Sequence, residues 1–156
     1  MHVLAAFWFV SGLVGRDFAF WRAGKATNVH AVHGLLQISD FFERYAVIPV
    51  SMAVLLFGLI VTLMQKWPLF GFIQGSRSNW LLVSFLLFLG ISLAIGPLKL
   101  VARRKQRTRA LEEALAQGTI TPELTAALND EVVVRFRAVE LIIVVVIIIL
   151  MVTKPF

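Results

Sequence analysis

The sequence predicts an all-α membrane protein: a four-transmembrane-helix bundle with an amphipathic interfacial helix and a cytoplasmic helical hairpin. Hydrophobic residues make up 59% of the 156 residues and charged residues only 15%, against about 45–50% and about 25% in a small soluble domain. A soluble globule of this size has too much surface to hide so many apolar side chains. Four long apolar stretches supply the spans, and we interpret residues 1–156 as a single integral membrane domain.

The predicted spans cover about residues 2–20, 45–64, 80–101 and 139–152. A helix needs about 20 apolar residues to cross a hydrocarbon layer of about 30 Å, and backbone groups in lipid must be hydrogen-bonded within the segment. No basic segment precedes the first span and no small-residue cleavage site follows it, so we do not expect a cleaved signal peptide. The fourth apolar run is short, so its helix should begin earlier.

Residues 26–44 repeat apolar side chains at helical spacing, opposite a polar stripe. The apolar positions are Val29, Val32, Leu36 and Phe42. This pattern predicts an amphipathic helix lying in the membrane interface, or one continuous with the second span.

Residues 102–138 predict a cytoplasmic helical hairpin. The helix of the third span continues into this segment and breaks at Gly118. Thr121, Pro122 and Glu123 then form a start signal, with threonine as N-cap and proline at the first helical position. We expect the restarted helix to run unbroken into the fourth span.

Basic residues between the spans predict the orientation, because cytoplasmic loops carry an excess of lysine and arginine. The segments on one side of the membrane contain Arg22, Lys25, Arg44, Arg103, Arg104, Lys105, Arg107, Arg109, Arg135 and Arg137, whereas the other side has Lys66, Arg77 and Lys154. Both termini should therefore lie on the non-cytoplasmic side. We attribute the net charge of +6 to topology and lipid headgroups rather than to nucleic-acid binding.

Small residues favour close helix packing in membranes. Ser11, Gly12 and Gly15 lie in the first span, and Gly90 and Ala94 in the third. We expect the first and third spans to form the central contact.

Five ionisable residues lie near the inner ends of the spans, where an unpaired charge costs roughly 2.5–3.5 kcal/mol on insertion scales. They are Arg16, Asp17, Lys99, Arg137 and Glu140. We predict a buried charge cluster in which Arg16 meets Glu140, and Asp17 meets Lys99 or Arg137. The cluster is either a structural clasp or a site for an anionic headgroup or carboxylate, which arginine binds in a forked geometry.

Histidines supply the remaining candidate ligands. His2 and Arg16 fall on one helical stripe about 21 Å apart, with His2 at the outer face. Its imidazole could bind a haem iron or copper, or it is an ordinary interfacial residue. His30 and His33, with Asp40 beyond, suit either a divalent metal or a solvated face, and we predict no metal site there. Zero cysteines exclude thiolate metal sites and disulfides.

Several short motifs resemble a family of small bacterial four-helix membrane proteins, domain of unknown function 2269. They are His2-Val3-Leu4, Gly12-Leu13, Arg16, Pro49, Trp80 and the closing Met151-Val152-Thr153-Lys154-Pro155-Phe156. The resemblance covers nearly the whole chain and implies a multi-pass protein of the bacterial inner membrane. The family has no assigned activity.

The chain is also distantly similar to haem-containing protoporphyrinogen oxidases of the HemJ type and to copper-resistance D membrane domains. The similarity to the HemJ type lies in His2 ten residues before Gly12-Leu13, then Arg16, and in Arg137, Glu140 and Lys154-Pro155-Phe156. This resemblance implies that His2 binds haem b. The HemJ-type lysine proposed as second haem ligand is replaced by Ser84, a poor axial ligand, which puts six-coordinate haem and the oxidase activity in doubt.

Two hypotheses for function follow, and they leave open whether the chain is an enzyme. The first is a redox or porphyrin-handling protein that binds b-type haem through His2. The alternative is a non-catalytic accessory or structural subunit that packs against other membrane subunits or a second copy of itself. Copper or solute passage is a weaker hypothesis, because no span carries a ladder of methionine and histidine. No catalytic residue is identified.

Overall fold

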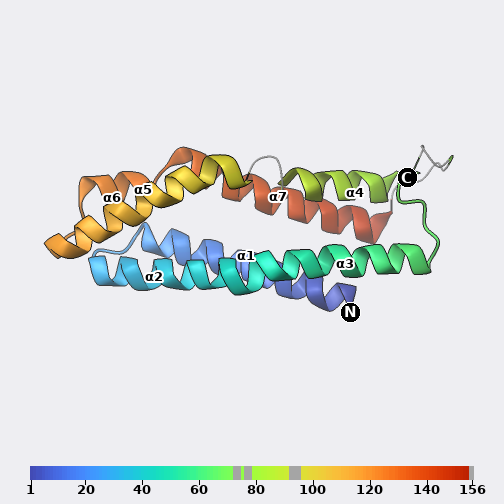
Figure 1. The fold of residues 1–156 in the computed structure, drawn as a ribbon, viewed down its shortest axis with the longest axis horizontal. Helices are drawn as coiled ribbons and strands as arrows, with labels where there is room; N and C mark the ends of the chain where they lie inside the picture. The colour runs from blue at the N-terminus through green and yellow to red at the C-terminus, as the bar shows by residue number, and fades with distance from the viewer. Residues whose placement is uncertain (72–74, 76–78, 92–95, 155–156) are drawn as a thin grey trace.

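The computed structural model describes residues 1–71, 75, 79–91 and 96–154, without the side chains of residues 96–100. Every regular element in these ranges is helical: α1 (His2–Ala23), α2 (Val29–Phe42), the π-helical turn η1 (Glu43–Val47), α3 (Ile48–Met64), α4 (Trp80–Leu89), α5 (Gly96–Gln117), α6 (Pro122–Leu128) and α7 (Glu131–Thr153). The helices run along one long axis, and both termini lie at the same end (Figure 1).

Three helical segments are long and apolar enough to cross a membrane: His2–Ala23, Val29–Met64 and Pro122–Thr153. The predicted span 80–101 begins with α4, a shorter apolar helix, and its residues 92–95 lie outside the described part of the chain. The all-helical membrane architecture is therefore confirmed, with three candidate spans among the described residues.

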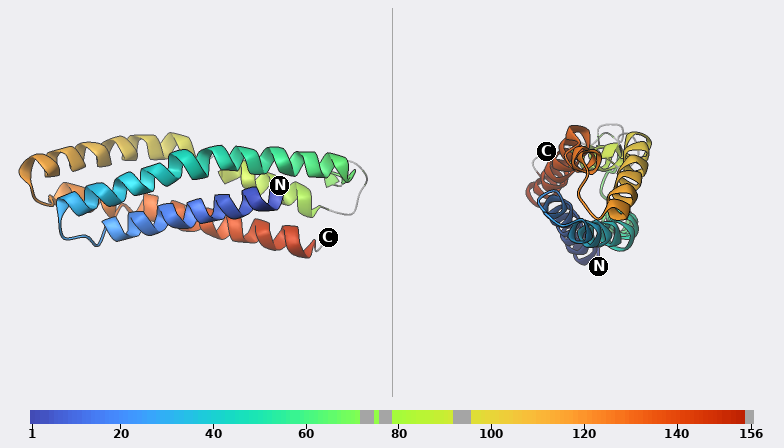
Figure 2. Two further views of the ribbon diagram at one scale, coloured as in Figure 1. Left: turned by 90° about the horizontal axis from the view of Figure 1, so that it is seen from below. Right: turned by 90° about the vertical axis from the view of Figure 1, so that its left-hand side faces the viewer.

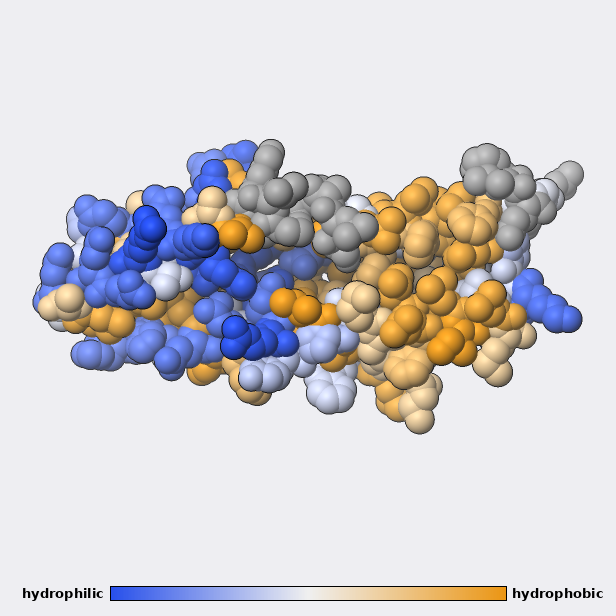
Figure 3. All heavy atoms as spheres, viewed as in Figure 1, coloured by the Kyte–Doolittle hydropathy of each residue, from blue (hydrophilic) through white to orange (hydrophobic). Residues whose placement is uncertain are grey.

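The long axis divides the molecule into an apolar end and a polar end (Figure 3). Each end has its own buried core. The core of the apolar end consists of Ala5, Phe9, Leu13, Val47, Val50 and Val144. The core of the polar end consists of Phe20, Ala23, Val29, Val32, Leu36, Ala110, Ala114, Leu124 and Leu128.

Of the two alternatives for residues 26–44, the structure confirms the helix that is continuous with the second span. α2, η1 and α3 form one continuous helical segment, and α2 and α3 lie nearly in line (Figure 1). The apolar stripe formed by Val29, Val32 and Leu36 packs against α1, α5 and α6 in the core of the polar end. Protein therefore covers the face that the sequence pattern assigned to lipid.

Among the described residues, the main partner of α1 is the neighbouring segment α2–η1–α3 rather than the predicted third span, which α1 contacts through the rings of Phe9 and Phe88. A Cβ on Gly90 of that span would meet nothing within 4 Å, and Ala94 lies outside the described residues.

Figure 2 shows α1 and the segment α2–η1–α3 side by side. A Cβ atom on Gly12 would lie only 2.7 Å from the Cβ of Ala46, and one on Gly15 would lie 2.8 Å from the ring of Phe42. The glycines permit this close approach, and a short turn between the two segments makes them antiparallel neighbours.

The helix expected to run unbroken into the fourth span is interrupted at Asn129 and Asp130. The Asp130 carboxylate caps α7 by accepting hydrogen bonds from the backbone N–H groups of Val132 at 2.9 Å and Val133 at 3.4 Å. Arg103 of α5 also pairs with this carboxylate. Aspartate satisfies helix N-terminal N–H groups well, so a new helix starts here and α6 can turn onto α5.

Replacing Gly12 with alanine should destabilise the protein, because the new methyl group would overlap Ala46. We expect a loss of about 1–3 kcal/mol, typical of overpacking, measured as thermal unfolding in detergent. Gly34→Ala is the matched control, since a Cβ at Gly34 meets nothing within 4 Å. The control should be neutral or stabilising by about 0.5–1 kcal/mol. Equal effects of the two changes would contradict the close approach of α1 and η1.

Candidate functional site: the Arg16 network

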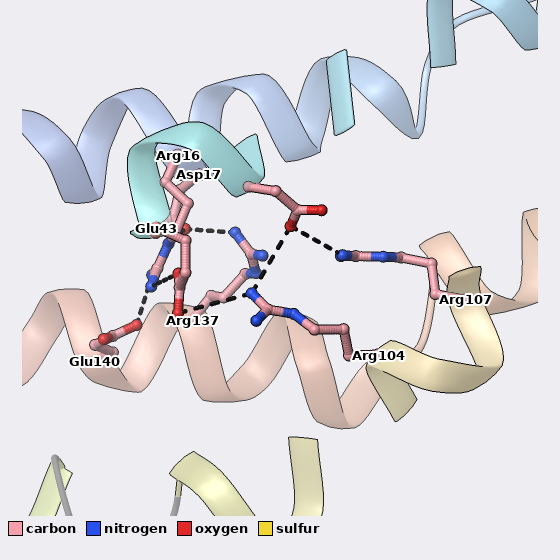
Figure 4. A network of polar contacts seen from close by, with 8 residues as sticks. Arg16, Asp17, Glu43, Arg104, Arg107, Arg137 and Glu140 are labelled. Carbon is pink, nitrogen blue, oxygen red and sulfur yellow. Dashed lines mark hydrogen bonds and ion pairs between the residues drawn. The ribbon is translucent and has the colours of Figure 1, made fainter. Parts of the chain in front are cut away.

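Arg16 lies at the centre of a buried set of ion pairs that join three helical segments (Figure 4). Its side chain is almost fully buried. Its Nε donates to Asp17 Oδ1 at 2.9 Å, its Nη1 to Glu43 Oε2 at 2.9 Å, and its Nη2 to Glu140 Oε2 at 2.6 Å. Asp17 follows Arg16 on α1, Glu43 begins η1, and Glu140 projects from α7. All three nitrogens of this guanidinium therefore have a carboxylate partner.

Arg137 completes the Arg16 network, by which we mean Arg16, Asp17, Glu43, Arg137 and Glu140. It lies one turn before Glu140 on α7 and donates to Asp17 Oδ1 at 2.8 Å. Its guanidinium also stacks over the ring of Phe20, with 4.1 Å between the guanidinium carbon and the ring centroid. Arg16 and Asp17 of α1 are thus both held by charged residues of α7.

Two arginines of α5 extend the network toward the polar end. Arg104 Nη2 lies 3.7 Å from Asp40 Oδ1 and 3.8 Å from Glu43 Oε1, which is longer than a hydrogen bond. Arg107 Nη2 donates to Asp40 Oδ1 at 3.2 Å. Burial lowers the pKa of the Arg107 guanidinium, and Asp40 only partly opposes this shift. Arginine nevertheless stays protonated, so Arg107 is a buried charge paired with the half-exposed carboxylate of Asp40.

The structure brings together four of the five predicted cluster residues: Arg16, Asp17, Arg137 and Glu140. Lys99 lies in α5, and its side chain is outside the described part of the structure. Of the two partners predicted for Asp17, Lys99 and Arg137, the structure shows Arg137. Sequence reasoning missed Glu43, although an acidic residue just before the second span was a usable signal.

The ion pairs join four arginines to four carboxylates, so the set carries balanced charge (Figure 4): Arg16, Arg104, Arg107 and Arg137 with Asp17, Asp40, Glu43 and Glu140. Asp40, Arg104 and Arg107 were missed because they lie in polar segments, where a charge needs no special explanation. A neutral, hydrogen-bonded set can be buried at membrane depth, whereas its separate members could not. The arrangement can fix helices relative to one another, and we see in its geometry no nucleophile or acid–base pair.

His2 lies at the opposite end of α1 and is half-buried against α3. Its Nδ1 lies 3.1 Å from the backbone oxygen of Val54. Because a carbonyl oxygen only accepts hydrogen bonds, Nδ1 is the protonated nitrogen of the neutral ring, and in that tautomer Nε2 has the lone pair. A Cβ on Gly58 would come within 3.2 Å of the imidazole, so this glycine makes room for the ring. No other polar partner of His2 is found among the described residues.

The other histidines and Ser84 form no ligand set. His30 is exposed and His33 half-buried on α2. Among the described residues, no group of three or more histidine, aspartate and glutamate side chains could hold a metal ion. Ser84 is buried and its hydroxyl donates to the backbone oxygen of Trp80 at 2.8 Å. This hydroxyl therefore already donates its hydrogen bond within its own helix.

Long apolar helices, an apolar end with exposed aliphatic side chains and a buried charge network define a small integral membrane protein. The family described as predicted integral membrane protein (DUF2269) matches residues 1–155, and the chain belongs to this family. No curated protein and no solved structure matches the chain.

Replacing Glu140 with glutamine should lower stability more than replacing Glu123. Glu140 is buried against Arg16, whereas Glu123 is exposed in the first turn of α6. We expect a loss of about 2 kcal/mol for Glu140→Gln, less than the roughly 3–5 kcal/mol of a fully unpaired buried charge, because Asp17 and Glu43 remain. Thermal unfolding in detergent measures both variants, and equal effects would argue against a buried Glu140.

Proposed function

We propose that this protein binds b-type haem or a related porphyrin through His2, with a redox-related role. The observation that carries the proposal is the hydrogen bond from His2 Nδ1 to the Val54 carbonyl. Metal-binding histidines usually donate their other ring nitrogen in this way, which fixes the tautomer and orients the ring. The distant similarity of His2, Gly12 and Arg16 to the HemJ type supports the same assignment.

The residues present fit one axial ligand from this chain. His2 Nε2 has the required lone pair, and the ring is held against α3 by Val54 and Gly58. The position of the second HemJ-type ligand holds Ser84, whose hydroxyl is already engaged. Bound haem would supply one-electron redox chemistry, while the chain would orient the imidazole and surround it with apolar side chains.

The haem proposal is tested by an absorbance spectrum of protein purified from haem-replete cells. We expect a Soret band that shifts on reduction with dithionite and is lost in His2→Ala, because that change removes the only proposed ligand. His30→Ala is the matched control, since His30 is an exposed histidine far along the chain, and it should keep the band. A colourless wild-type preparation would sink the proposal.

The alternative is a non-catalytic accessory subunit in a larger membrane complex or a homodimer. It is favoured by the many exposed apolar side chains of α7, such as Ile142 at 61% and Ile149 at 53% exposure. Lipid covers such a face in a monomer, and helices of a partner would cover it in a complex. A colourless protein that co-purifies in defined stoichiometry with another membrane subunit would support this alternative.

The proposed topology has four spans in the bacterial inner membrane, with both termini on the non-cytoplasmic side and the hairpin 102–138 in the cytoplasm. The basic residues supply the orientation. The third span would consist of α4 and the first part of α5, because α4 alone has ten residues and is too short for a layer of about 30 Å.

Single-cysteine labelling tests this topology, because the chain has no native cysteine. Gln65 and Gln117 are both exposed, at the ends of α3 and α5. A membrane-impermeant maleimide should label Gln65→Cys in intact cells but Gln117→Cys only after permeabilisation. The reverse pattern would overturn the orientation, and identical labelling of both would contradict the third crossing.

A further inference from the structure

Exposed apolar side chains show where the polar end enters the membrane boundary. On α1, Trp21 is 51% exposed and lies five residues beyond Arg16. On α2, Ile38 is exposed five residues before Glu43, and on α7, Val134 is exposed six residues before Glu140. These steps correspond to about 7–9 Å along each helix. Exposed apolar side chains therefore continue past the Arg16 network, which lies near the polar-end edge of the apolar layer, and we place the boundary between the network and Trp21.

The side chains at this boundary are those typical of a membrane interface. The ammonium group of Lys25 lies 4.0 Å from the ring centroid of Trp21, and the exposed rings of Phe41 and Tyr45 contact each other. Tryptophan and tyrosine favour the headgroup level, with lysine and arginine reaching to phosphate. Arg104 and Arg107 reach Asp40 of α2, which places their guanidinium groups at the same level.

These two guanidinium groups have hydrogen-bonding capacity to spare. The Arg104 side chain is 51% exposed, and its only ion pairs with described residues are those of 3.7 and 3.8 Å. Arg107 makes one hydrogen bond, at 3.2 Å, although a guanidinium has five N–H donors. Both share Asp40, whose side chain is 53% exposed. Arg16, in contrast, is fully engaged.

We infer that Arg104 and Arg107 form a binding site for the phosphate of an anionic phosphate-bearing ligand at the polar-end boundary. A phosphate would accept forked hydrogen bonds from both guanidinium groups, which share the one carboxylate of Asp40. Two sources share this chemistry: a phospholipid headgroup and a soluble phosphate compound. The boundary position favours the lipid, whose acyl chains would lie along exposed apolar side chains. This inference does not depend on the haem proposal.

The test measures binding of short-chain phosphatidylglycerol, and separately of inorganic phosphate, to the purified full chain in neutral detergent by calorimetry. Arg104→Gln is the main variant, because a half-exposed side chain can be replaced without unfolding the protein. Arg109→Gln is the matched control: Arg109 is exposed on the same helix and has the same charge. We expect Arg104→Gln to weaken binding about ten-fold, equivalent to about 1.4 kcal/mol, and Arg109→Gln to change it less than about two-fold.

The outcomes separate the two sources of phosphate. Binding of phosphatidylglycerol that depends on Arg104 supports a lipid site. Binding of inorganic phosphate alone, with the same dependence, supports a phosphate site for a soluble ligand. Equal weakening by Arg104→Gln and Arg109→Gln shows nonspecific attraction and overturns the inference, as does the absence of binding by either probe.

Discussion

The buried guanidinium of Arg16 determines how the helices of this protein fit together. It bonds to carboxylates from α1, η1 and α7, whereas the backbones of α1 and α7 approach each other over only a short stretch. A buried ion pair adds little net stability over apolar packing, but leaving one partner unpaired is costly. The network therefore mainly specifies the register of α7 against α1. In any other register, charged side chains would lie unpaired in the apolar layer.

The π-helical turn η1 supplies both a carboxylate for Arg16 and a small side chain for the close packing against α1. Within one short element, Glu43 reaches Arg16 and Ala46 lies against Gly12. An extra residue in a helical turn changes which side chains share a face. The segment can therefore satisfy the charge of α1 and approach its backbone closely, before it continues as the apolar α3.

Hydropathy predicted the helices because apolar length is a local property of the sequence, and the high cost of charge at depth identified Arg16 and Glu140. Hydropathy could not predict which helix packs against α1, because Gly12 permits close packing with any neighbouring helix. Glu43 was missed because it lies just outside the predicted span, whereas the break before α7 had a readable signal in the N-cap residue Asp130. Arg104 and Arg107 needed the three-dimensional arrangement.

The two cores are coupled by charge rather than by continuous apolar packing. The segment α2–η1–α3 has 36 residues, about 54 Å of helix, and so must project well beyond a hydrocarbon layer of about 30 Å. Its projecting end packs on Ala110 and Ala114 in the second half of α5, whereas Arg104 and Arg107, near the middle of α5, reach Asp40 and Glu43 through ion pairs. Arg104 and Arg107 therefore connect α5 to the carboxylates of α2 and η1 beside the Arg16 network, between the two apolar cores.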